Sequence, residues 1–102
     1  MTEFKFNGHN LRLVKGKYEG GKTAIVVMEE GSQFAVLTVN LPVLLKNGEF
    51  IIKTWSENAP IANLLRESRF FRDTKRRIKT GLVEAEVWEF QSPYSLDDVD
   101  QM

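Results

Sequence analysis

The chain has 102 residues, with 14 basic and 14 acidic side chains and no cysteine. This length fits a single domain, and the lack of cysteine excludes disulfides, thiolate zinc sites and cysteine nucleophiles. The neutral total charge indicates neither a nucleic-acid binder nor an acidic mimic. No signal-peptide pattern is visible, and the apolar runs are far shorter than the ~20 residues that cross a bilayer. We therefore expect a cytoplasmic protein with no membrane contact.

The first half of the chain has the pattern of short strands separated by glycine turns. Alternating apolar residues predict strands over residues 4–6 and 11–14, followed by a turn at Gly20–Gly21. Residues 23–30 and 33–40 are rich in β-branched types and are apolar at almost every position. Such runs predict central strands with little exposure on either face.

The second half of the chain predicts two further strands and one helix. Residues 50–55 have the composition of a strand. An apolar stripe at positions i, i+3 and i+4 then predicts a short amphipathic helix over about 58–68. Residues 69–80 are charged and irregular, with a partly extended backbone as the alternative, whereas 82–90 alternate between apolar and acidic residues and so predict a last strand.

Together these elements predict an α+β fold: a mostly antiparallel β-sheet of about six strands packed against one short α-helix. The connections are short, and short connections favour antiparallel hairpins because parallel pairs need long crossovers. We expect Trp55 and Trp88 to anchor the helix on the sheet. Residues 1–92 are expected to form a single domain, and residues 93–102 a loose acidic tail.

One stretch matches a nucleotide-binding pattern. Residues 16–23, GKYEGGKT, satisfy the G-x-x-x-x-G-K-[ST] pattern of phosphate-binding loops. Such a loop needs a helix directly after it, because the N-terminal amides and the dipole of that helix hold the phosphates. A strand-forming run follows Thr23 instead. We therefore predict a hairpin turn between strands 11–14 and 23–30, and a nucleotide-dependent enzyme that uses Lys22 and Thr23 is only the third hypothesis.

No other constellation in the sequence points to catalysis or to metal binding. His9 is the only histidine and lies in a turn-like sequence. Several carboxylates lie on strand positions that usually face water rather than forming acid–base pairs: Glu29, Glu30, Glu84, Glu86 and Glu89. We therefore expect no enzymatic activity, no cofactor and no metal site.

The most unusual feature is the uneven distribution of charge. Residues 66–79 contain seven basic and two acidic side chains, a net charge of +5, so the rest of the chain carries −5. Residues 84–100 contain six acids and no base. The candidate interaction surface consists of Arg66, Arg69, Phe70, Phe71, Arg72, Lys75, Arg76, Arg77 and Lys79. It could bind a protein or a nucleic acid, be neutralised internally by the acidic segment, or support self-association through opposite charges.

Three stretches carry a resemblance to a known family. TVNLP (38–42), IIKTWSEN (51–58) and TGLVEAEVWE (80–89), in this order and spacing, resemble a small family of uncharacterised bacterial proteins catalogued as domain of unknown function 4313. The resemblance covers residues 3–90 and leaves the acidic tail outside. It implies an association with phages, plasmids and other mobile genetic elements. The family has no assigned activity, so no catalytic residue can be transferred.

These observations favour a small non-enzymatic protein-interaction module carried by a mobile element, with an accessory or counter-defence role. The alternative is a nucleic-acid-binding protein that uses the basic segment 66–79, whose affinity would fall steeply with salt because phosphate binding releases counterions. A homo-oligomer is a further possibility.

Overall fold

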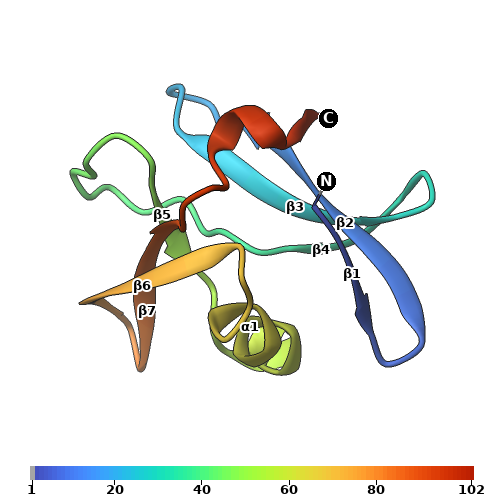
Figure 1. Ribbon diagram of the computed structural model, residues 1–102. Helices are drawn as coiled ribbons and strands as arrows, with labels where there is room; N and C mark the ends of the chain where they lie inside the picture. The colour runs from blue at the N-terminus through green and yellow to red at the C-terminus, as the bar shows by residue number, and fades with distance from the viewer. Residues whose placement is uncertain (1) are drawn as a thin grey trace.

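The structure is a computed structural model that describes residues 2–102. Over this range the chain forms eight β-strands, one α-helix and two short 3-10 helices. The strands make one five-stranded and one three-stranded sheet, and helix α1 lies at one side between them (Figure 1). The predicted α+β, mainly antiparallel fold is confirmed, although the strands divide between two sheets.

The first sheet contains the strands of the N-terminal half and the last strand of the chain. Its strands follow the order β1-β2-β3-β4 with antiparallel neighbours, and β8 pairs parallel with β2. The bounds are Glu3–Phe6 (β1), His9–Lys17 (β2), Thr23–Glu29 (β3), Ser32–Val36 (β4) and Asp100–Gln101 (β8). Gly20 and Gly21, in the β2–β3 turn, both have φ +94°, a conformation that glycine adopts without steric cost. The predicted hairpin at this turn is confirmed.

The second sheet is smaller and is joined to the first by a bridging segment. Its order is β5-β7-β6, all antiparallel, with bounds Glu49–Ile52 (β5), Phe71–Thr80 (β6) and Val83–Phe90 (β7). The Leu37 N–H donates to the Ile25 carbonyl of β3 at 2.9 Å, and the Val39 N–H donates to the Ile51 carbonyl of β5 at 3.0 Å. The chain after β4 therefore passes from one sheet to the other and holds them together.

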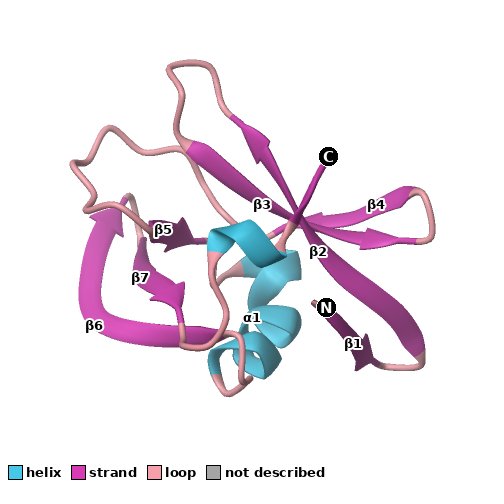
Figure 2. Cartoon of the chain, turned by 45° about the horizontal axis from the view of Figure 1, so that its top comes forward, coloured by secondary structure: helices cyan, strands magenta, loops and turns pink. Residues whose placement is uncertain are grey.

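The helix covers the space between the two sheets. A 3-10 turn, η1 (Ser56–Asn58), leads into α1 (Ala59–Arg66), close to the predicted range. The stripe of α1 that faces inward is buried, and Figure 2 shows the helix beside both sheets. The core combines residues of both sheets, of α1 and of the C-terminal segment: Leu11, Leu13, Ile25, Val27, Leu37, Phe50, Ile52, Ile61, Ala62, Leu65, Phe70, Phe71, Trp88 and Val99. No helix within residues 2–102 is long and apolar enough to span a bilayer.

Residues 69–80, which we expected to be irregular or partly extended, are strand over most of their length, because residues 71–80 form the edge strand β6. This strand pairs with β7 along its length, with a register shift between Asp73 and Arg77 where Lys75 has φ +72°. Composition gave no strand signal here, because β6 has almost no apolar alternation. Its backbone is held by the well-patterned strand β7 beside it, a contact that local sequence does not reveal.

Residues 93–102, which we expected to form a loose tail, pack against the domain. The ring of Tyr94 lies 5.0 Å from that of Phe70, and Val99 is only 2% exposed. A short 3-10 turn, η2 (Leu96–Asp98), leads into β8, and the Met102 N–H donates to the Lys15 carbonyl at 2.8 Å. Val99 in the core, with Tyr94 and Leu96 packed against it, therefore anchors this segment.

Candidate functional site

The basic residues singled out in the sequence gather on and around β6. Arg66 ends α1, and Arg69 and Phe70 lie in the loop before β6, which carries the other members. Six of the cationic side chains belong to exposed residues: Arg69, Arg72, Lys75, Arg76, Arg77 and Lys79. The fold therefore brings the predicted cations to one edge of the second sheet.

Phe70 and Phe71 do not belong to this surface, which corrects their place in the candidate set. They are 0% and 2% exposed. The Phe70 ring packs edge-on against Phe4 at 6.2 Å, and the Phe71 ring stacks on Phe90 at 4.9 Å. Both rings fill the core where the chain passes from α1 into the second sheet, so neither is free to stack on a ligand.

Arg66 is bound to a carboxylate on β7. Its Nε and Nη2 donate to Glu86 Oε1 and Oε2 at 2.8 and 3.0 Å, and the Trp88 indole N–H also donates to Glu86 Oε1 at 2.9 Å. The Glu86 side chain is 14% exposed. Burial alone would raise the pKa of Glu86, but the hydrogen bonds from Arg66 and Trp88 outweigh it and hold that pKa below its usual value. This carboxylate joins the helix to the second sheet.

Arg72 and Arg76 bind acids on the neighbouring strands. Arg72 lies opposite Glu89 of β7 in the strand register and donates a hydrogen bond to it. Arg76 Nη1 donates to Glu49 Oε1 at 2.7 Å. Because β7 lies between β5 and β6, this bond spans the whole three-stranded sheet.

Two further carboxylates complete the network. Burial would raise the pKa of Glu49, but the backbone N–H of Lys46 and the guanidinium of Arg76 lower it overall. Arg77 donates to both oxygens of Asp73, at 3.0 and 2.9 Å, and this pairing keeps the pKa of Asp73 below its usual value. Four of the arginines are thus neutralised by acids of β5, β6 and β7.

Three cations of the candidate set have no acidic hydrogen-bond partner among residues 2–102. Arg69 Nε donates to the Tyr94 hydroxyl at 2.9 Å, and its guanidinium lies 4.5 Å from the centre of the Phe70 ring. Lys79 lies opposite Glu84 in the register, but no ion pair joins them in the described chain, and the ammonium of Lys75 has none either. No ion pair joins the acids of the C-terminal segment to these three cations within residues 2–102: Asp100 pairs with Arg12 at 3.2 Å, and the segment reaches Arg69 through Tyr94.

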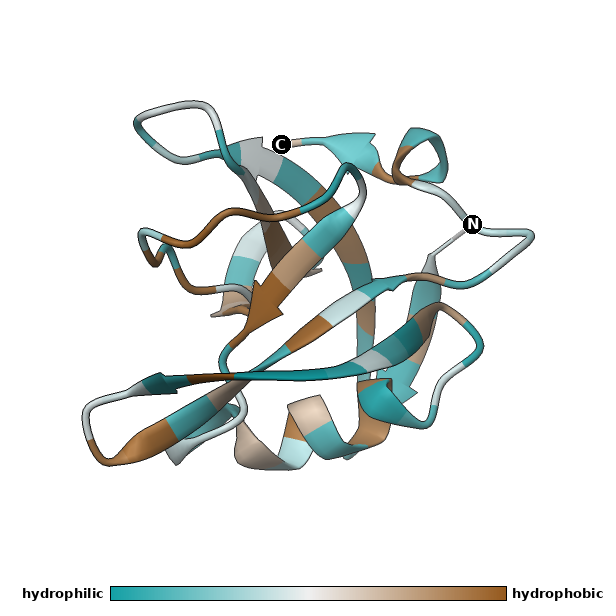
Figure 3. Cartoon of the chain, turned by 90° about the vertical axis from the view of Figure 1, so that its left-hand side faces the viewer, coloured by the Kyte–Doolittle hydropathy of each residue, from teal (hydrophilic) through white to brown (hydrophobic). Residues whose placement is uncertain are grey.

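Leu82, at the start of the predicted strand 82–90, lies instead at the tip of the β6–β7 hairpin. Its side chain is fully exposed, at 106% of the reference area. The preceding Gly81 has φ +61° and makes the tight turn possible. Figure 3 shows this hairpin projecting from the body with an apolar tip. The signal was available in the letters TGL, because a leucine stands at a turn position that is usually polar.

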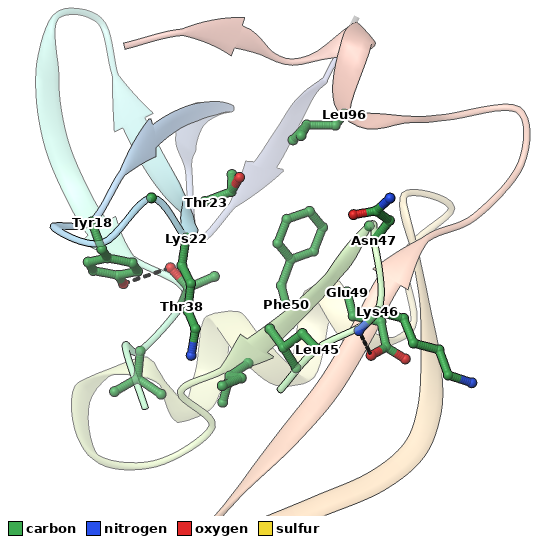
Figure 4. Close-up of a pocket in the computed structure, with 14 residues that line it drawn as sticks. Tyr18, Lys22, Thr23, Thr38, Leu45, Lys46, Asn47, Glu49, Phe50 and Leu96 are labelled. Carbon is green, nitrogen blue, oxygen red and sulfur yellow. Dashed lines mark hydrogen bonds between the residues drawn. The ribbon is translucent and has the colours of Figure 1, made fainter. Parts of the chain in front are cut away.

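The GKYEGGKT stretch lines a separate cavity of about 200 Å³ (Figure 4). The Tyr18 N–H donates to the Lys22 carbonyl at 2.8 Å, and the Gly21 N–H donates to the Tyr18 carbonyl at 3.0 Å. Lys22 Nζ donates to the carbonyls of Leu41 and Val43. The Gly21 N–H and the Lys22 ammonium, two groups that a phosphate loop would turn toward its ligand, therefore have partners within the chain, and the strand β3 follows where a helix would be needed.

The one histidine of the sequence pairs with a single carboxylate. His9 Nδ1 lies 2.7 Å from Glu29 Oε2, and the His9 ring lies 5.1 Å from that of Phe34. Residues 2–102 contain no group of three or more histidine or acidic side chains placed to hold a metal ion. Comparison with family models, with curated proteins and with solved structures finds no match to this chain.

Proposed function

We propose that this chain is a non-enzymatic protein-interaction module that contacts its partner through the β6–β7 hairpin. The observation that carries the proposal is the fully exposed Leu82 at the hairpin tip, on an arm that also presents Lys75 and Lys79. A single exposed leucine is common on protein surfaces. This one stands at the tip of a projecting hairpin whose strand β6 also carries two lysines without ion-pair partners in residues 2–102. A partner could cover the leucine and place acids along the strand against the lysines.

The hairpin suits a protein partner better than a nucleic acid. Single-stranded nucleic acids are bound by free cations together with exposed aromatic rings, and duplexes by cations free to contact phosphates. Here four arginines are bound to the chain's own acids, and Phe70 and Phe71 are buried. The exposed carboxylate of Glu84 also faces outward near Lys79. The alternative of nucleic-acid binding through residues 66–79 is supported by the density of basic residues alone.

The wider role is part of the same proposal. An accessory or counter-defence function on a mobile genetic element is supported by the resemblance of residues 38–42, 51–58 and 80–89 to the family named above. Proteins of that kind can act by binding and blocking host machinery without chemistry of their own. The absence of an evident catalytic set in the sequence is consistent with such a role.

The test compares two matched triple variants in a quantitative pulldown from host-cell lysate. The hairpin variant combines Lys75→Glu, Lys79→Glu and Leu82→Ser, whose side chains make no ion pair within residues 2–102. The control variant combines Lys5→Glu, Lys17→Glu and Leu64→Ser, which change the same residue types on other elements.

We expect the hairpin variant to lose its partners and the control to keep them, with both showing an unchanged circular dichroism spectrum. Identical partners for the hairpin variant and the parent protein would refute the proposal. The nucleic-acid alternative would be favoured if the parent protein retarded RNA or DNA in a gel at low salt and the hairpin variant did not.

A further inference from the structure

Residues 41–45, with the sequence LPVLL, form a run of five consecutive apolar residues outside the core. Leu44 is 94% exposed, Pro42 is exposed, and the other three are only partly covered. The partly covered residues beside Pro42 and Leu44 keep the run from forming a continuous exposed patch. Leu44 is nevertheless a large apolar side chain almost wholly open to solvent, so we consider it as a contact point.

The loop is held in one conformation by the lysine of GKYEGGKT. Lys22 Nζ donates to the carbonyls of Leu41 and Val43, the second at 2.9 Å, and the Val43 N–H donates to the Leu41 carbonyl at 2.8 Å. Leu45 lines the same cavity as Phe50 (Figure 4). Since the backbone is ordered before a partner arrives, binding through this loop would lose little conformational entropy.

The surroundings of the loop indicate what it would meet. Lys46 follows the apolar run directly, is exposed, and has no ion-pair partner for its ammonium among residues 2–102. In Figure 4 its side chain points away from the cavity. The loop and the β6–β7 hairpin project on the same side of the molecule, as Figures 1 and 3 show.

We propose that residues 41–45 form a preordered docking loop that inserts Leu44 into an apolar pocket of a partner protein. A carboxylate at the rim of that pocket faces Lys46, because an opposite charge on the partner complements an exposed ammonium at the edge of an apolar contact. A lipid surface fits less well, since one inserted leucine and one lysine give weak membrane binding. The inference rests on the proposed function and adds a second contact on the same side.

The first step of the test identifies what lies against Leu44. Leu44 is replaced in the full chain by the photo-crosslinking residue benzoylphenylalanine, and Leu64 of α1, which is 38% exposed, is replaced likewise as the control. We expect one protein to be crosslinked from position 44 and not from position 64. The crosslinked peptide should lie in an apolar pocket that has Asp or Glu at its rim.

The second step measures affinity for that purified protein. Leu44→Ser should weaken binding about tenfold or more, since an inserted leucine side chain is then lost. Lys22→Met should weaken it about two- to tenfold by releasing the loop, and Leu44→Met should change it less than about threefold because the volume is kept.

Three outcomes would overturn the inference. The first is crosslinking from position 44 to a second copy only, with concentration-dependent dimerisation in sedimentation. The second is co-sedimentation with phosphatidylcholine–phosphatidylserine vesicles that Leu44→Ser abolishes. The third is unchanged affinity of Leu44→Ser for a partner that the hairpin variant no longer binds, which would leave the proposed function standing. If neither variant weakens binding, both proposals fail.

Discussion

Glu86→Gln should destabilise the fold because it removes the charge that Arg66 binds. In the structure Glu86 accepts two hydrogen bonds from Arg66 and one from the Trp88 indole, with its side chain 14% exposed and that of Arg66 24% exposed. Hydrogen bonds to charged groups contribute about 1.5–3 kcal/mol. Because both side chains keep some solvent contact, we expect a loss of about 2 kcal/mol in the free energy of unfolding, a factor of about thirty in the unfolding constant.

The measurement is urea unfolding followed by tryptophan fluorescence, since Trp88 is fully buried and bonded to Glu86. Glu84→Gln is the matched control, because Glu84 lies on the same strand, is exposed and has no ion pair in the described chain. A double-mutant cycle with Arg66→Met isolates the pairwise contribution. If Glu86→Gln costs no more than Glu84→Gln, the network is only a surface feature and the reasoning fails.

Three further predictions follow from burial, pKa and backbone conformation. The lowered pKa values of Glu49, Asp73 and Glu86 mean that their stabilisation is complete above the unfolded-state values, 4.5 for Glu and 3.8 for Asp. This stabilisation is lost as the pH falls through the folded-state pKa values. The free energy of unfolding should therefore stay level from about pH 6 to 5 and then decline. A free energy that stays level down to about pH 3 would contradict this. Val99→Ala should cost about 1.5–3 kcal/mol in chemical unfolding, because two methyl groups leave a core position that is 2% exposed; a cost under about 0.5 kcal/mol would show that the segment is not anchored there. Gly81→Ala should lower the free energy of unfolding by about 1–2 kcal/mol through its backbone conformation alone, because φ is +61° and no atom lies within 4 Å of the added Cβ. An unchanged melting temperature would refute this.

The parts of the fold that depend on neighbouring residues in the sequence could be predicted. The glycine turn after β2, the helix α1 and the alternation of β7 are local patterns, and each appears close to its expected position. Within α1 the predicted stripe is only partly correct, because Leu64 is 38% exposed and Ala62 is buried in its place. The strand β6 could not be predicted, because its pairing depends on β7 and on the ion pairs beside it. The packing of residues 93–102 depends on Val99 reaching a core built by distant segments.

The candidate surface was predicted only as a group of residues. The sequence identified the basic cluster, but not which acids would face it, because the pairing of Arg72 with Glu89 depends on the strand register. Phe70 and Phe71 were misplaced, since two adjacent aromatic rings in a charged segment look exposed until a core forms around them. Leu82 was missed because it was counted as part of a strand. The partner itself leaves no signal in local sequence.

The edge of β2 has a consequence for how the molecule would respond to force. Thr2 exchanges hydrogen bonds with Leu13 at 3.2 Å, β1 pairs beyond it, and β8 takes the adjoining positions at Val14 and Lys15. Both ends of the described chain are thus fastened to one strand. Tension applied between Thr2 and Met102 would act on the hydrogen bonds that join the two chain ends to β2, one after another, and would not shear the whole five-stranded sheet at once. The β2 edge would yield first, at low force, while the second sheet and its arginine network stayed closed.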